Sequence, residues 1–211
     1  MSARRSFEAA PRMRSVTGSG SVMLARMRPN WFIALPVSPM GWFETLPAPP
    51  EATRLFAPAD LHLTIAFLGD VDETKARASW AALAWPLPAM IATLGGVGPL
   101  GPKHRYSALS AALDEGREAV ERAIATARVA CCAAAVVTVD PRPALAHVTI
   151  ARPQRRASDA ERAAALAWAA EITLPKVPLR LDAAALYTWA EDRKDALFRI
   201  VERASLPIST R

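Results

Sequence analysis

The chain has 211 residues, of which 52% are hydrophobic and 22% charged. This composition is typical of a globular protein and excludes a wholly disordered chain. The net charge of +6 suggests nucleic-acid binding, but six arginines and a single glutamate lie within residues 1–28. Because the remainder is nearly neutral, the sequence excludes a protein that holds nucleic acid through a broad basic surface with many phosphate contacts.

Residues 1–28 mix Arg, Ser, Gly and Met without apolar periodicity, which is typical of an unfolded tail. Excluding this tail leaves residues 29–211 as a single domain. A transit peptide has a similar composition. Alternatively, translation begins at Met23 or Met27, so that the tail is not made.

Cys131 and Cys132 are adjacent in an alanine-rich stretch, and neighbouring cysteines rarely satisfy disulfide geometry. We therefore expect small core residues in a cytoplasmic protein. No apolar run approaches the roughly 20 residues of a membrane helix, so no membrane association is expected.

Short apolar segments alternate with longer helical patterns along the rest of the chain. The first segment, Trp31 to Leu35, ends at Pro36, which cannot donate to a sheet ladder. The short connections favour an α+β fold with two antiparallel or mixed sheets around a central groove and helices on the outside. The expected strands are 31–35, 61–68, 91–97, 106–113, 133–139, 146–151, 177–188 and 196–201, and the expected helices are 73–85, 115–130 and 158–171.

One nine-residue segment occurs twice. Residues 58–66, PADLHLTIA, align with residues 143–151, PALAHVTIA, and six of the nine positions are identical. The two histidines, His62 and His147, are separated by about half the length of the core. The repeat therefore indicates one supersecondary unit used twice, and predicts a bilobal, duplicated domain with a pseudo-twofold axis.

Each copy of the repeat carries a His-x-Thr motif on an expected strand. Side chains at i and i+2 share a face, so His62 lies beside Thr64 and His147 beside Thr149. Two facing strands would then present two imidazoles and two hydroxyls. Imidazole, with an unperturbed pKa of about 6.5, serves as acid or base near neutrality, and the hydroxyls can donate to phosphoryl oxygens.

With these motifs the chain resembles the 2H phosphoesterase superfamily, and within it the LigT-like RNA 2′,3′-cyclic phosphodiesterases. The resemblance implies a bilobal fold with the active site in the central groove. It implies that His62 protonates the leaving ribose oxygen and that His147 activates the attacking water. Thr64, Thr149 and Arg152 would bind the phosphate. The matching segments are WFIALP at 31–36, LHLTIAFLG at 61–69 and HVTIAR at 147–152.

Three features depart from the family pattern. The proline-rich connection between Pro36 and His62 is short where the family has a long helix. No tryptophan occurs in residues 106–109, where the family often has one for the nucleobase. Arg152 lies five residues beyond His147, so strict alternation would direct it to the opposite face. Its phosphate role therefore requires a bulge before Pro153.

The sequence thus predicts an enzyme that hydrolyses RNA 2′,3′-cyclic phosphate ends to a phosphomonoester. We expect the enzyme to act without a metal or cofactor, because no further His, Cys or carboxylate ligands accompany the two histidines. We also expect a monomer. One alternative substrate is a small cyclic phosphate or a 2′,5′-linked nucleotide. Another alternative is a non-catalytic module that binds RNA ends.

Three further side chains have weaker interpretations. His104 lies between Lys103 and Arg105 in a Gly/Pro-rich loop without a partner at useful spacing, and is expected in a solvated loop. Tyr187 and Trp189 could stack on a base, as aromatic platforms do in single-strand binders.

Overall fold

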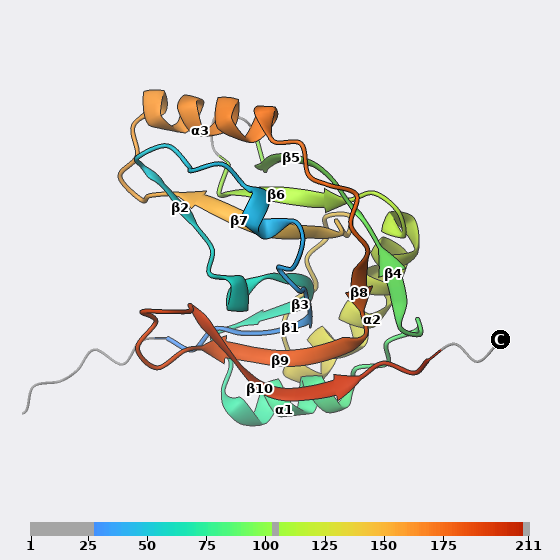
Figure 1. Cartoon of the computed structure of the whole chain (residues 1–211). Coiled ribbons are helices and arrows are strands. Elements are labelled where there is room, and N and C mark those ends of the chain that lie inside the picture. Colours follow the sequence, from blue (N-terminus) through green and yellow to red (C-terminus); the bar gives the residue numbers. More distant parts are fainter. Residues whose placement is uncertain (1–27, 103–105, 209–211) are drawn as a thin grey trace, which may run out of the picture.

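The structure is a computed structural model that describes residues 28–102 and 106–208. The expected α+β fold is confirmed (Figure 1). Residues 1–27 of the expected tail, and His104, lie outside the described residues. The helices are α1 (Glu73–Ala81), α2 (Arg117–Ala135) and α3 (Asp159–Glu171), with short 3-10 turns at Phe43–Thr45 and Pro58–Asp60. The strands are β1 (Trp31–Pro36), β2 (Thr53–Leu55), β3 (His62–Gly69), β4 (Met90–Ala92), β5 (Leu94–Leu100), β6 (Ala108–Leu113), β7 (His147–Pro153), β8 (Leu179–Leu181), β9 (Ala183–Trp189) and β10 (Phe198–Ser205).

Eight strands form one antiparallel sheet in the order β10-β9-β1-β3-β7-β6-β5, with β2 paired to the far end of β7. The strands β4 and β8 form a separate two-stranded sheet. Between β3 and β7 the register contains a single residue pair, Leu63 with Val148. The large sheet is therefore two halves joined at one point, which is the bilobal arrangement expected from the repeat.

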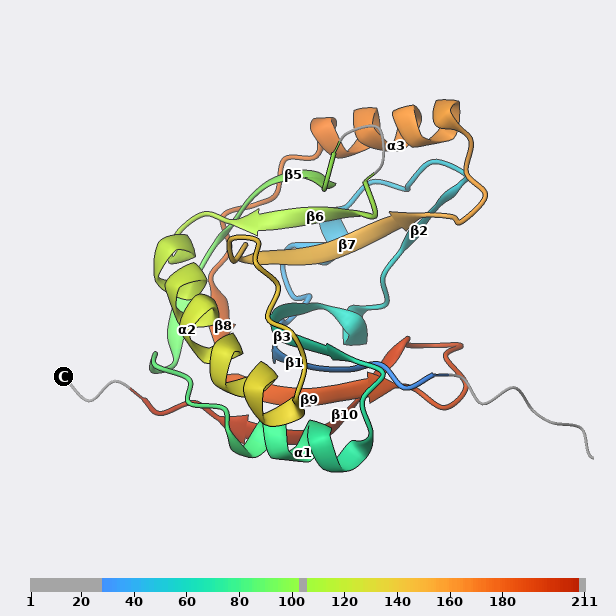
Figure 2. The same ribbon diagram turned by 180° about the vertical axis from the view of Figure 1, so that it is seen from behind.

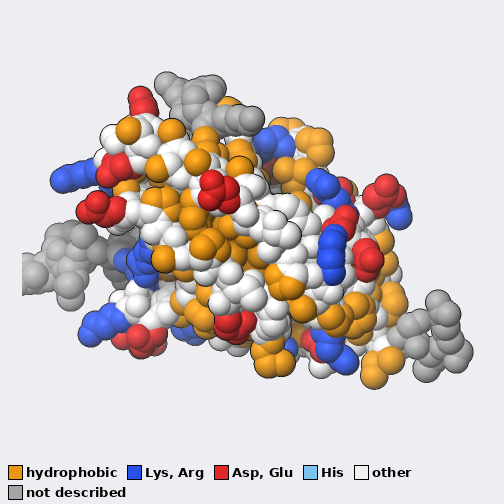
Figure 3. Space-filling model, turned by 45° about the horizontal axis from the view of Figure 1, so that its top comes forward, with side chains coloured by type: hydrophobic (Ala, Val, Ile, Leu, Met, Phe, Trp, Pro, Cys, Tyr) orange, Lys and Arg blue, Asp and Glu red, His pale blue; other side chains and the backbone are white. Residues whose placement is uncertain are grey.

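The helices lie outside the two halves (Figure 1). α3 packs on β5 and β7, and α1 packs on β1 and β9. α2 packs on α1 and β3 and runs along one side from one half to the other (Figure 2). On the face shown in Figure 3, acidic and basic side chains are intermingled and form no broad basic area, as the nearly neutral core composition implies.

The strand predicted at residues 133–139 is wrong, because α2 continues to Ala135 and ends at Val136 in a left-handed conformation. Its buried face includes Ile124, Ala127, Cys131 and Ala135, a helical spacing that continues through the alanine-rich stretch. Val136 and Val137 are β-branched and so favour a strand, but they lie at the end of the helix. Both cysteines are buried and unpaired, and burial raises the pKa of the Cys131 thiol to about 11, so their role as core residues is confirmed.

Other boundaries also differ from the prediction. The segment 91–97 falls on two strands, β4 and β5, the segment 177–188 is likewise two strands, β8 and β9, and the short strand β2 has no counterpart among the expected strands. α1 ends at Ala81 rather than at Trp85. The connection before His62 contains no α-helix, in agreement with the departure seen in the sequence. Three-residue strands carry too few side chains for alternation to be recognised.

Both repeat strands contain a β-bulge at the same position of the motif. Along β1 and β3 the register shifts between the pairs Ala34–Thr64 and Ile33–Ala66, which leaves Ile65 as the extra residue. Along β6 and β7 the shift leaves Ile150 as the extra residue. The repeat thus extends from sequence to backbone geometry, and each bulge changes which face the following side chains occupy.

Candidate active site

The two His-x-Thr motifs meet where the two halves of the sheet join. His62 and Thr64 flank Leu63, and His147 and Thr149 flank Val148, the one residue pair that joins β3 to β7. His147 and Arg152 lie close enough to His62 for their charges to act on it. Thr64 and His147 line one cavity of about 540 Å³. The structure therefore brings together both imidazoles and both hydroxyls that the sequence predicted.

Each histidine is held in the same way by the backbone of its own strand. His62 Nδ1 lies 2.6 Å from the carbonyl oxygen of Asp60, and His147 Nδ1 lies 2.8 Å from that of Leu145. A carbonyl oxygen can only accept, so Nδ1 carries the proton in both rings. Nε2 is then the nitrogen available for proton transfer in each ring.

Arg152 joins this group because of the bulge at Ile150. Thr149 pairs with Ser110 and Ala151 pairs with Leu109, so Ile150 and Ala151 are both buried and Arg152 returns to the face of Thr149. Its guanidinium lies 5.1 Å above the ring of Phe56. The bulge that Arg152 required is therefore present.

Aromatic side chains surround the imidazole of His62. Its ring centroid lies 4.7 Å from that of Phe32, 5.5 Å from Tyr187 and 5.7 Å from Phe198. Burial among these rings lowers the pKa of His62 to about 4, and repulsion from His147 and Arg152 adds to the decrease. His62 is therefore neutral in the ligand-free protein at neutral pH.

His147 has a different environment, although its motif is the same. Burial lowers the pKa of His147, and its hydrogen bond to Leu145 opposes that decrease. Desolvation alone lowers the pKa of Arg152. The larger decrease at His62, which comes mainly from burial among the aromatic rings and also from repulsion by Arg152, makes His147 the more basic imidazole of the ligand-free protein.

Asp60 links His62 to the β9–β10 hairpin, a role that the sequence analysis did not predict. Its buried carboxylate accepts hydrogen bonds from the backbone N–H groups of Leu197 and Phe198 at 2.8–2.9 Å. The same residue holds His62 Nδ1 through its carbonyl. One residue thus orients the imidazole and fixes the strand that carries Phe198. A signal was available, since the repeat has an acidic residue here where the other copy has Leu145.

Ser110 is a second neighbour of the site that sequence reasoning missed. It is buried on β6, and its hydroxyl lies 3.3 Å from that of Thr149. This contact orients Thr149 from β6, the strand that begins within residues 106–109, where the family often has a tryptophan.

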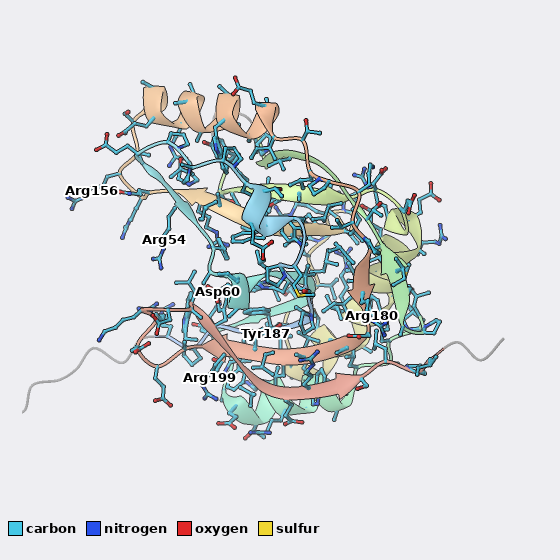
Figure 4. The ribbon with its side chains drawn as sticks, viewed as in Figure 1. Arg54, Asp60, Arg156, Arg180, Tyr187 and Arg199 are labelled. Carbon is cyan, nitrogen blue, oxygen red and sulfur yellow. The ribbon has the colours of Figure 1, made fainter. Side chains whose placement is uncertain are left out.

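Tyr187 and Trp189 do not offer free ring faces for stacking on a base. Tyr187 is 1% exposed and stacks on Phe32, and Figure 4 shows it within the sheet. Trp189 stacks on Phe198 with one face and has Arg193 over its ring at 5.0 Å. The charged residues 191–194 lie in the turn between β9 and β10.

Within residues 28–102 and 106–208, no three His, Cys, Asp or Glu side chains are grouped so that they could hold a metal ion. None of the described helices is long and apolar enough to cross a membrane. The donors gathered at the site are instead two imidazoles, three hydroxyls and a guanidinium, which suit proton transfer to and from a phosphoryl group and the binding of its oxygens.

Comparison with known structures places this geometry in a known fold. The protein TT0787 of Thermus thermophilus is 20% identical, with a TM-score of 0.63 over 86% of this chain and 100% of that one. E. coli LigT complexed with NADP⁺ is 22% identical, with a TM-score of 0.60 over 85% of this chain and 98% of LigT. LigT complexed with 3′-AMP is 21% identical, with a TM-score of 0.58 over 84% and 97%.

A search of curated proteins found no match. The sequence profile of the 2′-5′ RNA ligase superfamily matches residues 47–193, a segment that contains both His-x-Thr motifs and Arg152. This match covers more than half of the chain, and the structural comparisons agree with it. The chain therefore belongs to the 2′-5′ RNA ligase superfamily, has the LigT-like 2H phosphoesterase fold, and is an enzyme of phosphodiester chemistry.

Proposed function

We propose that the protein hydrolyses RNA 2′,3′-cyclic phosphate ends to a phosphomonoester, with His62 and His147 as the acid and base. The observation that carries this proposal is the matched geometry of the two imidazoles. Each holds its Nδ1 proton on a backbone carbonyl and keeps Nε2 for the substrate. Two such nitrogens beside two hydroxyls and a guanidinium match the needs of a phosphodiester that is opened by water.

The proposed reaction moves two protons. One imidazole accepts a proton from water as the water oxygen attacks phosphorus. The bond from phosphorus to one ribose oxygen breaks, and the other imidazole donates a proton to that oxygen. Thr64, Thr149 and Arg152 would bind the remaining phosphoryl oxygens and stabilise the charge that develops on them. The product is a ribose with one free hydroxyl and one monoester.

The known ligands of LigT support a nucleotide substrate. LigT has been crystallised with 3′-AMP and with NADP⁺, and the superfamily takes its name from 2′-5′ RNA ligation. Cleavage of a 2′,5′-linked nucleotide by the same groups is the second candidate. The intact set of five site residues favours either reaction over an RNA-end-binding module without turnover.

A panel of substrates tests the proposal. We expect turnover of a short RNA with a 2′,3′-cyclic phosphate end to exceed turnover of a 2′,5′-linked dinucleotide. Product analysis should show one phosphomonoester per cleaved ring.

Exhaustive chelation should leave the rate unchanged, since the two imidazoles supply the proton transfers. Loss of activity with EDTA that added Zn²⁺ or Mg²⁺ restores would contradict the metal-independent mechanism.

The pH dependence should be displaced to the acid side of the ordinary histidine value. The free enzyme holds one proton on the pair only between the pKa of His62, about 4, and that of His147, which is also lowered. We therefore expect kcat/KM to peak below pH 6.5 and to fall as the pair loses its last proton. Bound phosphate attracts the imidazolium, so the kcat profile should lie at higher pH. A kcat/KM optimum above pH 7 would contradict these shifts.

A further inference from the structure

A second cavity lies beside the histidine pair and is lined by arginine side chains. It has a volume of about 460 Å³ and includes Arg54, Arg152 and Arg155. Phe56 and Asp60 also line this cavity. We call this cavity the arginine pocket. Its three cations face a single carboxylate, so its net charge is positive.

Arg54 and Arg152 are directly opposite each other on the antiparallel strands β2 and β7. Directly opposed residues have Cβ atoms about 4.5–5.5 Å apart on one face, and like charges there are destabilising. Among the described residues, the side chains of Arg54 and Arg155 have no ion pair or hydrogen bond, and the guanidinium of Arg152 lies over the ring of Phe56 without a carboxylate partner. The repulsion in this pair is thus not relieved by any described carboxylate.

The carboxylate of Asp60 does not neutralise these arginines. Both of its oxygens already accept backbone N–H bonds from Leu197 and Phe198. An anion bound between the guanidinium groups would relieve their repulsion. The planar guanidinium fork suits the bidentate binding of phosphate in particular.

The position of the arginine pocket relates it to the scissile phosphate. Arg152 follows Thr149 by three residues on the same face, and its charge acts on His62. Arg54 lies beyond Arg152 on β2, and Figure 4 shows it on the side of that strand toward Asp60. The pocket thus begins where the proposed site of the cyclic phosphate ends.

We propose that the arginine pocket binds a second phosphate group of the substrate, next along the chain from the phosphate that is cleaved. This inference rests on the proposed function and narrows its substrate class to cyclic-phosphate ends that carry a further phosphate. That second phosphate is either the internal phosphodiester of an oligonucleotide or the 5′-phosphate of a single nucleotide. Arg54 and Arg155 bind it, and Arg152 lies between the two phosphates.

Three cytidine substrates separate the possibilities. The first is cytidine 2′,3′-cyclic phosphate with a free 5′-hydroxyl, the second is the same compound with a 5′-phosphate, and the third is a dinucleotide that ends in the same ring. We expect the native protein to have a lower KM for a substrate with a second phosphate than for the first. Whether the second or the third substrate benefits more identifies the source of that phosphate.

Arg54→Ala and Arg155→Ala should each raise KM for the substrate with two phosphates by about 10-fold or more, the value of a charged hydrogen bond. Neither change should alter KM for the substrate with one. Arg156→Ala is the matched control, because it removes the same charge from a residue outside the pocket, in the turn between β7 and α3 (Figure 4). Equal effects on all three substrates, or no effect on any, would overturn the proposal.

Binding measurements keep the test independent of turnover. Calorimetry should show tighter binding of adenosine 3′,5′-bisphosphate than of adenosine 3′-monophosphate, and Arg54→Ala should remove the difference. Arg54→Gln serves as the second variant if the alanine variant fails to fold. If the native protein cleaves no cyclic phosphate yet keeps this preference, the proposed function fails and the pocket stands. Equal affinities for the two ligands would refute the pocket.

Discussion

Replacing either His62 or His147 by alanine is expected to lower kcat by about 10²–10⁴-fold, the usual contribution of a positioned acid or base. Both rings present Nε2 from equivalent places in the repeat, so neither can substitute for the other in a reaction that needs two proton transfers. The double variant should lose less than the product of the two single effects, because the groups act as a unit. Thr64→Ala and Thr149→Ala serve as milder comparisons in the same assay.

A substrate with an acidic leaving group separates the two roles. A nucleoside 3′-(p-nitrophenyl phosphate) releases an anion that needs no protonation, so the variant that lost the acid should recover, whereas the variant that lost the base should not. Recovery of His62→Ala would assign the order that the family resemblance implies. Recovery of His147→Ala would assign the order that the ligand-free pKa shifts favour. If both single variants recover, or if either retains a native rate on a cyclic phosphate, the paired mechanism is wrong.

Asp60→Ala is expected to decrease the free energy of unfolding by about 3 kcal/mol, because the N–H groups of Leu197 and Phe198 lose their buried acceptor. Asp60→Asn should cost less, since its amide oxygen still accepts. Urea denaturation measures both changes. Asp70→Asn is the control, because Asp70 is an exposed carboxylate whose pair with Arg28 is a surface contact and should contribute less than about 1 kcal/mol.

Asp60→Ala should also act on the active site. Releasing the hairpin moves Phe198 away from His62 and exposes the imidazole to water. Because burial is the main cause of its low pKa, exposure should raise the pKa of His62 from about 4 toward its ordinary value of about 6.5. An NMR titration of the imidazole protons measures this shift. An unchanged pKa in a folded Asp60→Ala protein would show that the hairpin does not control His62.

Local signals suffice for most of the fold and for the candidate site. Each His-x-Thr motif lies on a short apolar strand. Side chains alternate between the two faces of a strand, so the histidine and its threonine share a face wherever the strand forms. Helices with clear caps are also predictable. α3 has a capping box between Ser158 and Glu161, and its predicted span, 158–171, differs by one residue at its start. The end of α2 is not predictable in this way, because Val136 and Val137 follow a helix that alanines continue.

The paired imidazoles and hydroxyls could be predicted from the sequence, because their spacing depends only on local strand geometry. The differences between the two copies of the repeat arise from contacts between distant parts of the chain. A bulge at Ile150 directs Arg152 to the site, and the strands β9 and β10, more than 100 residues after His62, lower its pKa through Tyr187 and Phe198. The arginine pocket likewise depends on β2 pairing with β7. Such contacts join residues far apart in the chain, so no local pattern reveals them.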